Sequence, residues 1–216
     1  MAKQSGQTLI ETIVAIFILT TALTTGLGLV IYVFSAGSVS QNQIIATSLA
    51  KEGVEVVRMM RDTNWLEADK KGGSIELQPC ADLGDKFCYP DYYKGVGGSG
   101  YSNYKLEVSN NDNKYRLEYN SASRTWNLTT NNNYNLYVQP DGSFTHDING
   151  NSVYARRIKI IHNTASPYTV QNPELIIQSI VGWRDKKCTP MTGQDPESTN
   201  CKIVIEERLT NWKDYK

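Results

Sequence analysis

The stretch Gly6-Gln7-Thr8-Leu9-Ile10-Glu11, followed by an uncharged run from Thr12 to Phe34, decides the fold of this chain. An uncharged run of this length makes about 35 Å of helix, and the hydrocarbon core of a bilayer is roughly 30 Å thick. Glu11 stands at the edge of the run, where a carboxylate is costly unless it has a function. The sequence therefore predicts a membrane-spanning helix with a functional carboxylate at its start.

The pattern Gly-x-Thr-Leu-Ile-Glu before an apolar helix resembles the processing motif of type IV prepilins and pseudopilins. The resemblance implies that a prepilin peptidase cleaves after Gly6 and methylates the new amino terminus at Gln7, which retains the positive charge of the amine. It also implies that Glu11 pairs with the ammonium group of a neighbouring subunit and helps to set the register of a filament. Gln7 departs from the family pattern, which usually has phenylalanine at this position.

Two simpler interpretations of the N-terminus compete with this one, a cleaved secretory signal and a plain single-pass anchor. A secretory signal has an apolar core of about 7–15 residues, whereas this run is longer and is preceded by an acidic residue, Glu11. The small residues Ser35-Ala36-Gly37 are the candidate cleavage site under that interpretation. The length of the run and the position of Glu11 favour the prepilin interpretation.

The charged residues indicate how the chain is oriented in the membrane, but they indicate no specific binding partner. The chain of 216 residues has 22 basic and 22 acidic residues, so the composition gives no electrostatic footprint for nucleic acid and leaves that partner unknown. Lys3 is the only charged residue before Glu11, and Lys51 is the next one after it. A cationic N-terminus predicts a cytoplasmic start and an extracytoplasmic C-terminal domain. Together with this orientation, the resemblance implies an inner-membrane subunit, in contact with lipid, that later enters an extracellular filament.

The four cysteines, Cys80, Cys88, Cys188 and Cys201, form an even set in the part of the chain expected outside the cytoplasm. That setting favours disulfides, and local pairing would join Cys80 to Cys88 and Cys188 to Cys201. The competing interpretation is a four-thiolate zinc site, which usually uses close Cys-x-x-Cys pairs. The wider spacings favour disulfides over zinc or free thiols.

The helical pattern continues beyond the apolar run. No proline interrupts residues 8–64, and between residues 41 and 60 apolar residues recur at three-to-four spacing, which predicts an amphipathic helix. This stripe contains Ile45, Leu49, Gly53, Val56, Val57 and Met60. We expect a leader over 1–6, a helix over 7–64 with a membrane and assembly half (7–34) and an amphipathic half (35–64), and a head domain over 65–216.

Gly26 and Gly28 lie inside the apolar half, where each glycine costs about 1 kcal/mol relative to alanine. One interpretation is close approach of a second helix at small residues. The other, slightly favoured, is a weak point of the helix that can extend during assembly, as the family's proline does near this place.

The C-terminal part has the alternation of short strands. Runs at 74–78, 104–108, 114–119, 125–129, 134–138, 156–161, 175–183 and 202–209 predict strands, with turn chemistry at 110–113 and Pro140-Asp141-Gly142. One long helix followed by an antiparallel meander is an α+β arrangement, and it matches the type IV pilin-like fold that the resemblance implies.

Candidate chemistry elsewhere is sparse. His146 and His162 have no recognisable nucleophile partner in the sequence, so we expect surface or sheet histidines. Asp147–Asn151 is similar to a calcium loop but lacks its bidentate glutamate and has glycine in another place, so a turn is favoured. The thirteen tyrosines are expected mainly in packing. The sequence predicts no enzyme, no catalytic residue, no metal site and no cofactor.

The function expected is therefore a type IV pilin-like structural subunit whose partners are other pilin subunits, the prepilin peptidase and an inner-membrane assembly platform. Segments 52–58, 61–65, 181–183 and 206–213 resemble minor-pilin-like proteins of uncultivated small-genome bacteria, which favours a minor pilin. The alternatives are a pilus-associated adhesin or DNA-uptake receptor, a type II secretion pseudopilin, and a tethered domain with an unrelated activity.

Overall fold

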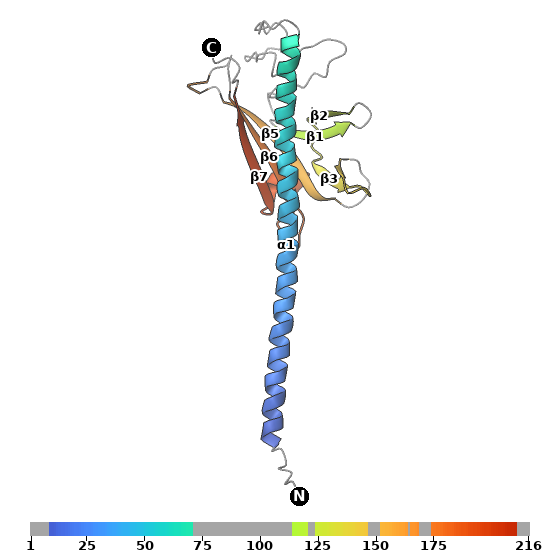
Figure 1. Cartoon of the computed structure of the whole chain (residues 1–216), viewed down its shortest axis with the longest axis vertical. Helices are drawn as coiled ribbons and strands as arrows, with labels where there is room; N and C mark the ends of the chain where they lie inside the picture. The colour runs from blue at the N-terminus through green and yellow to red at the C-terminus, as the bar shows by residue number, and fades with distance from the viewer. Residues whose placement is uncertain are drawn as a thin grey trace. The chain divides into compact units, whose positions relative to one another are not determined.

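A computed structural model describes residues 9–70, 114–120, 124–146, 152–163, 165–168 and 174–210, with side chains described up to residue 63 in the first range. In these ranges one long helix, α1 (Leu9–Lys70), precedes an antiparallel sheet, which confirms the α+β class and the type IV pilin-like order of elements (Figure 1). The expected strands at 74–78 and 104–108, with the turn at 110–113, lie outside the described residues.

Helix α1 ends later than the sequence predicted. It continues through Asn64 and Trp65 to Lys70, whereas the sequence pattern placed its end near residue 64. The physical reason is that Leu66, Glu67 and Ala68 are good helix formers, so the propensity of the next turn outweighs the weaker residues before it. The absence of proline throughout α1 is consistent with its continuity.

The chain divides into two compact units, Met1–Ile44 and Ile45–Lys216. The division falls inside α1, so the second half of the helix belongs to the same unit as the sheet. In that half, the predicted stripe of Leu49, Gly53, Val56, Val57 and Met60 is buried. Ile45, at the boundary, is half-buried.

The sheet of the second unit is built on its longest strand. Its elements are β1 (Lys114–Asn120), β2 (Thr125–Thr129), β3 (Asn135–Val138), β4 (Phe144–Thr145), β5 (Ser152–Asn163), β6 (Glu174–Trp183), the short turns η1 (Thr192–Gln194) and η2 (Pro196–Ser198), and β7 (Lys202–Leu209). Strand β5 pairs with β6, β1 and β3. Strand β6 pairs in turn with β7. Strand β2 continues the sheet from β1, and β4 continues it from β3.

The six strands expected inside the described ranges are present. Strands β2 and β7 have the predicted bounds, and β5 extends beyond its predicted bounds because Tyr154 and Ala155 also pair with β6. Strand β4 was not predicted, since two residues give no periodic signal. The predicted turn at Pro140-Asp141-Gly142 connects β3 to β4, and Gly142 has a φ of 83° there, which favours glycine.

The second half of α1 packs against the sheet at close range. A Cβ atom added to Gly53 would lie 2.5 Å from the Ser179 hydroxyl oxygen and 2.9 Å from the Ile158 Cδ1 atom. Only glycine therefore allows the helix to approach β5 and β6 this closely. Two clusters of buried side chains share this interface, one around Val57, Met60 and Ile177, and one around Leu49 and Val181.

Candidate assembly helix and head-domain anchors

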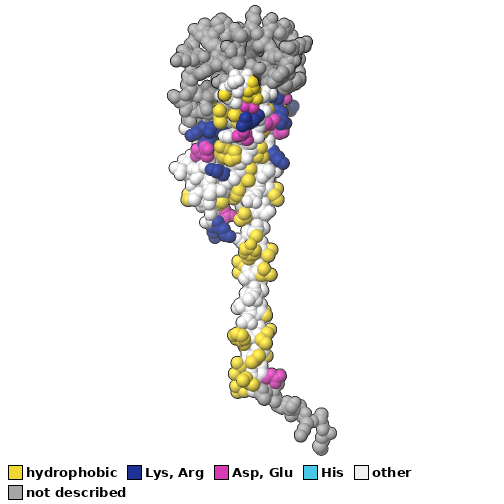
Figure 2. All heavy atoms as spheres, turned by 90° about the vertical axis from the view of Figure 1, so that its left-hand side faces the viewer, with side chains coloured by type: hydrophobic (Ala, Val, Ile, Leu, Met, Phe, Trp, Pro, Cys, Tyr) yellow, Lys and Arg dark blue, Asp and Glu magenta, His cyan; other side chains and the backbone are white. Residues whose placement is uncertain are grey.

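The first half of α1 exposes its apolar side chains on all sides. The exposed fraction is 77% for Leu9 and 76% for Phe34, and Figure 2 shows hydrophobic side chains over this part of the helix. The large hydrophobic residues exposed here are Leu9, Ile10, Ile13, Val14, Ile16, Phe17, Ile18, Leu19, Leu23, Leu27, Leu29, Val30, Ile31, Tyr32, Val33 and Phe34. An exposed surface of this size needs lipid or other helices to cover it. Among the described residues, α1 is the one helix long and apolar enough to cross a membrane.

Glu11 is the single charged residue between Leu9 and Ala50. It lies in the first turn of α1 and is exposed in the isolated chain. Once the apolar surface around it is covered, a carboxylate in this position requires a cation or several hydrogen-bond donors. The geometry therefore leaves Glu11 available to a partner from outside the described part of the chain.

Threonine hydroxyls in the apolar half are satisfied within the helix. Thr21 Oγ1 donates to the carbonyl oxygens of Phe17 and Ile18 at 2.9 Å each, and Thr25 Oγ1 donates to that of Thr21 at 2.8 Å. Thr20 and Thr24 make contacts of the same kind. Because these hydroxyls have partners on their own helix, they are compatible with an apolar environment.

Gly26 and Gly28 follow these threonines without interrupting the helix. A Cβ atom added to either glycine would meet no other atom within 4 Å. Among the described residues, then, no neighbour requires glycine at either position. Both interpretations of these glycines, a contact with another helix and a weak point of the helix, stay predictions.

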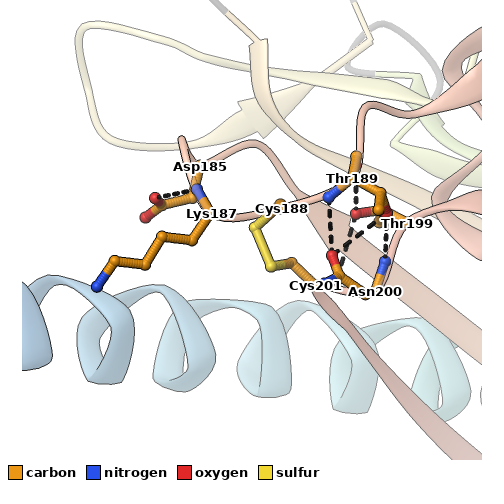
Figure 3. Close-up of a disulfide and its surroundings, with 7 residues drawn as sticks. All are labelled: Asp185, Lys187, Cys188, Thr189, Thr199, Asn200 and Cys201. Atoms are coloured by element: carbon orange, nitrogen blue, oxygen red, sulfur yellow. Dashed lines mark hydrogen bonds between the residues drawn. A yellow bond between two sulfur atoms is a disulfide. The ribbon is translucent and has the colours of Figure 1, made fainter.

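The disulfide between Cys188 and Cys201 is confirmed. It joins the two ends of a loop between β6 and β7, and its Cα–Cα distance is 5.5 Å. Figure 3 shows the bond between the two sulfur atoms. A disulfide excludes these two thiols from a zinc site. Cys80 and Cys88 lie outside the described residues, and their pairing stays a prediction. The cleavage and methylation residues Gly6 and Gln7 lie outside them as well.

The same loop is held by a buried arginine that sequence reasoning missed. Arg157, on β5, is fully buried, and its Nη1 atom donates to Asp195 Oδ1 at 2.6 Å while its Nη2 atom donates to Glu197. The hydrogen bond from Arg157 is the main cause that lowers the pKa of Glu197. The Cα atom of Pro196 also packs near Gly182, where an added Cβ would lie 3.1 Å away. An arginine in a strand gives no sequence signal for burial, because burial depends on the acidic residues of a distant turn.

A second buried arginine ties α1 to the sheet. Arg156 is 2% exposed, and its Nη1 atom donates to Glu52 Oε1 at 2.9 Å and to the Leu49 carbonyl oxygen at 3.3 Å. Its guanidinium also lies 6.0 Å from the centre of the Trp126 ring, within the range of a cation–π contact. The arrangement links α1, β5 and β2, so it has a structural role.

The remaining candidates are the two histidines and the possible calcium loop. His162 lies half-buried on β5, as expected for a sheet histidine, and His146 follows β4. The candidate calcium loop at Asp147–Asn151 lies outside the described residues. In the described ranges, no three His, Cys, Asp or Glu side chains gather in a way that could hold a metal ion.

Comparison with known proteins adds one finding at the N-terminus. Residues 1–27 match the family model described as the prokaryotic N-terminal methylation motif. This match includes Gly6, Gln7 and Glu11 and the first turns of the exposed apolar helix. No curated protein and no solved structure matches the chain.

Proposed function

We propose that this chain, which carries the N-terminal methylation motif of the type IV prepilin and pseudopilin family, is a structural subunit that assembles through the first half of α1. The observation that carries the proposal is the methylation motif placed directly before an exposed apolar helix with a single charge at its start. The motif implies a prepilin peptidase as the processing enzyme and pilin-like subunits as partners.

The Glu11 carboxylate provides a charge that a neighbouring subunit can neutralise during assembly. Processing after Gly6 would create an ammonium group at Gln7, four residues before Glu11. In a bundle of apolar helices each of these charges alone would cost several kcal/mol, whereas a pair between neighbouring subunits neutralises both. Such a pair would form only at one axial offset of two helices. We infer that Glu11 sets this offset.

Before assembly, we propose that α1 is anchored in the inner membrane with its N-terminus in the cytoplasm and the sheet domain outside. The length of the apolar half and its satisfied threonines support the membrane span. The disulfide supports a position of the sheet domain outside the cytoplasm. The subunit would then be drawn into an extracellular filament by an inner-membrane assembly platform.

Within this class we propose a minor pilin without enzymatic activity. The support is the sequence likeness to minor-pilin-like proteins, and the use of Arg156 and Arg157 in packing contacts within the head. An adhesin or a DNA-uptake receptor is the runner-up. A receptor for DNA would need an open basic surface, and these two buried arginines are paired with carboxylates.

The test compares Glu11→Ala with Glu55→Ala in cells that contain the peptidase and the assembly machinery. Glu55 lies on the same helix but is exposed in the second half, where its ion pair with Arg58 is worth less than about 1 kcal/mol. Both variants should be cleaved after Gly6, as mass spectrometry of the membrane fraction would show. We expect Glu11→Ala to be lost from sheared filaments and Glu55→Ala to be retained.

Three outcomes would contradict the proposal. An intact Met1 terminus in the presence of the peptidase would exclude processing, and cleavage near Ala36 would indicate a secretory signal instead. Normal amounts of Glu11→Ala in filaments would show that the carboxylate has no role in the register.

A further inference from the structure

The loop between β6 and β7, residues 184–201, contacts both faces of the end of β6. Its disulfide packs against the cluster that contains Val181, on the face of the sheet that contacts α1. Gly182 is on the opposite face, because successive strand residues alternate between the two faces. There a Cβ atom added to Gly182 would lie 3.1 Å from the Pro196 Cα atom. The loop therefore encloses the end of the strand, and we call it the clasp.

Arg157 lies under the clasp, on the same face of the sheet as Gly182. It is opposite Ile180 in the β5–β6 ladder. Its Nη1 atom donates to Asp195 Oδ1 at 2.6 Å, and its Nη2 atom donates to Glu197. The exposed fraction of the side chain is 0% for Arg157, 27% for Asp195 and 48% for Glu197. The arginine thus loses its contact with water when the clasp is closed, whereas both carboxylates keep part of theirs.

Opposing contributions to the free energy decide whether the clasp closes over Arg157. Removal of a guanidinium from water is unfavourable and its ion pairs are favourable, and in buried pairs the two contributions are of similar size. The Arg157 Nε atom has no hydrogen-bond partner among the described residues, which makes closure less favourable. The burial of Pro196, in η2, adds one small apolar side chain in favour of closure. The ion pairs and this packing therefore leave the open and closed clasp close in free energy.

The polar contacts that join the two ends of the clasp lie beside the disulfide. The backbone N–H of Thr189 donates to Asn200 Oδ1 at 2.8 Å, and the backbone N–H of Asn200 donates to Thr189 Oγ1 at 2.9 Å (Figure 3). Both residues are exposed, so water can replace these hydrogen bonds when the clasp opens. Water cannot replace the disulfide, which makes this bond the contact that decides between the two states.

We propose that the clasp is a redox switch. With Cys188 and Cys201 as thiols it opens and returns Arg157 to water, and with the disulfide it closes over Arg157. In the closing step the two thiols transfer two electrons and two protons to a disulfide oxidant, whose own disulfide becomes two thiols. Such oxidants act outside the cytoplasm. The timing of closure, after export of the head, rests on the proposed location of the head, whereas the switch itself does not.

The test follows cleavage after Glu197 by a glutamate-specific protease, with the full chain in detergent micelles and mass spectrometry of the products. The wild type, with its disulfide, should be cleaved slowly at this bond. The double variant Cys188→Ser/Cys201→Ser should be cleaved at least tenfold faster. Serine substitution is preferred to a chemical reductant because it leaves Cys80 and Cys88 unchanged.

Arg157→Met distinguishes the switch from the simple loss of a crosslink. Methionine fills the site under the clasp and has no charge to remove from water. In this background the two serine substitutions should change the cleavage rate by less than about threefold. Arg156→Met is the matched control, because it removes the neighbouring buried arginine on the α1 side of the sheet. In that background the increase of at least tenfold should remain.

Amide hydrogen exchange provides a second measurement that does not need the methionine variants to fold. The serine variant should exchange faster than the wild type in residues 189–200, with unchanged protection in β5 and β6. Equal cleavage and exchange with and without the disulfide would overturn the proposal. A full increase in cleavage in the Arg157→Met background would overturn it as well, because opening would then not depend on the buried guanidinium.

Discussion

The two halves of α1 have the same backbone conformation and opposite surroundings. In residues 9–44 the large apolar side chains are exposed, whereas in residues 45–63 Ala46, Ala50 and Val57 are fully buried against the sheet. The first half has one charged residue, and the second half alternates a buried stripe with Lys51, Glu52, Glu55 and Arg58. The comparison shows that helical structure alone does not define a folding unit.

This difference has an energetic meaning. Side chains of the second half gain about 1.5–3 kcal/mol each from full burial in the head. In the described part of the chain those of the first half stay exposed, so their apolar surface is available for lipid or for other helices. The second half should therefore control the stability of the head, and the first half should control where the subunit resides.

The largest expected effect on stability appears when two fragments are compared, each beginning at a different residue near or after the start of the second half of α1. A fragment of residues 45–216 keeps the buried stripe and should fold as a soluble domain. A fragment of residues 65–216 loses several buried side chains, among them Val54, Val57 and Met60, whose combined contribution is comparable to the 5–15 kcal/mol stability of a typical domain.

Circular dichroism and a thermal unfolding scan distinguish the two fragments. We expect a cooperative transition for residues 45–216 and none for residues 65–216. Cooperative unfolding of the shorter fragment would show that the sheet does not need the helix. It would contradict the claim that the second half of α1 controls the stability of the head.

A smaller effect should separate Met60→Ala from Phe34→Ala. Met60 is 1% exposed in the core of the head, so its truncation should cost about 2–5 kcal/mol of unfolding free energy. Phe34 is exposed, and its truncation should change the unfolding of the head by less than about 0.5 kcal/mol. Urea unfolding of both variants in the same micelles measures the difference, and equal losses would argue against two separate units.

The smallest effect concerns two glycines, whose replacement by alanine should change stability in opposite directions. Gly53→Ala should destabilise the head by about 1–3 kcal/mol, because the new methyl group would collide with Ser179 and Ile158. The methyl group of Gly26→Ala would have no described atom within 4 Å, so this variant should raise the helix stability of the first half by up to about 1 kcal/mol.

Urea unfolding of the head measures the effect of Gly53→Ala, and far-ultraviolet circular dichroism measures the helix content of Gly26→Ala. A neutral Gly53→Ala would mean that the helix can withdraw from the sheet at no cost. A loss of helix in Gly26→Ala would indicate that this glycine has a contact beyond those within one chain.

The helix and most of the strands could be predicted from the sequence because the patterns that indicate them involve residues close together in the chain. The apolar run, the stripe at three-to-four spacing and the alternation in β7 each depend on residues a few positions apart, and the structure reproduces them. The end of α1 was predicted too early, since weak helix formers at 61–65 were given more weight than the residues after them. The Cys188–Cys201 pairing was predicted from local spacing, and the structure confirms it.

By itself the sequence determined a long N-terminal helix with one acidic residue, a following set of strands and the motif for processing. Only the tertiary structure decided that the helix changes from exposed to buried at residue 45, that Gly53 sits against Ser179, and that Arg157 is buried beneath the acidic turn at 195–197. It also brought His146 between two strands that are distant in sequence. The physical reason is that burial and pairing of these groups depend on partners many residues away, whereas helix and strand periodicity depend on neighbours.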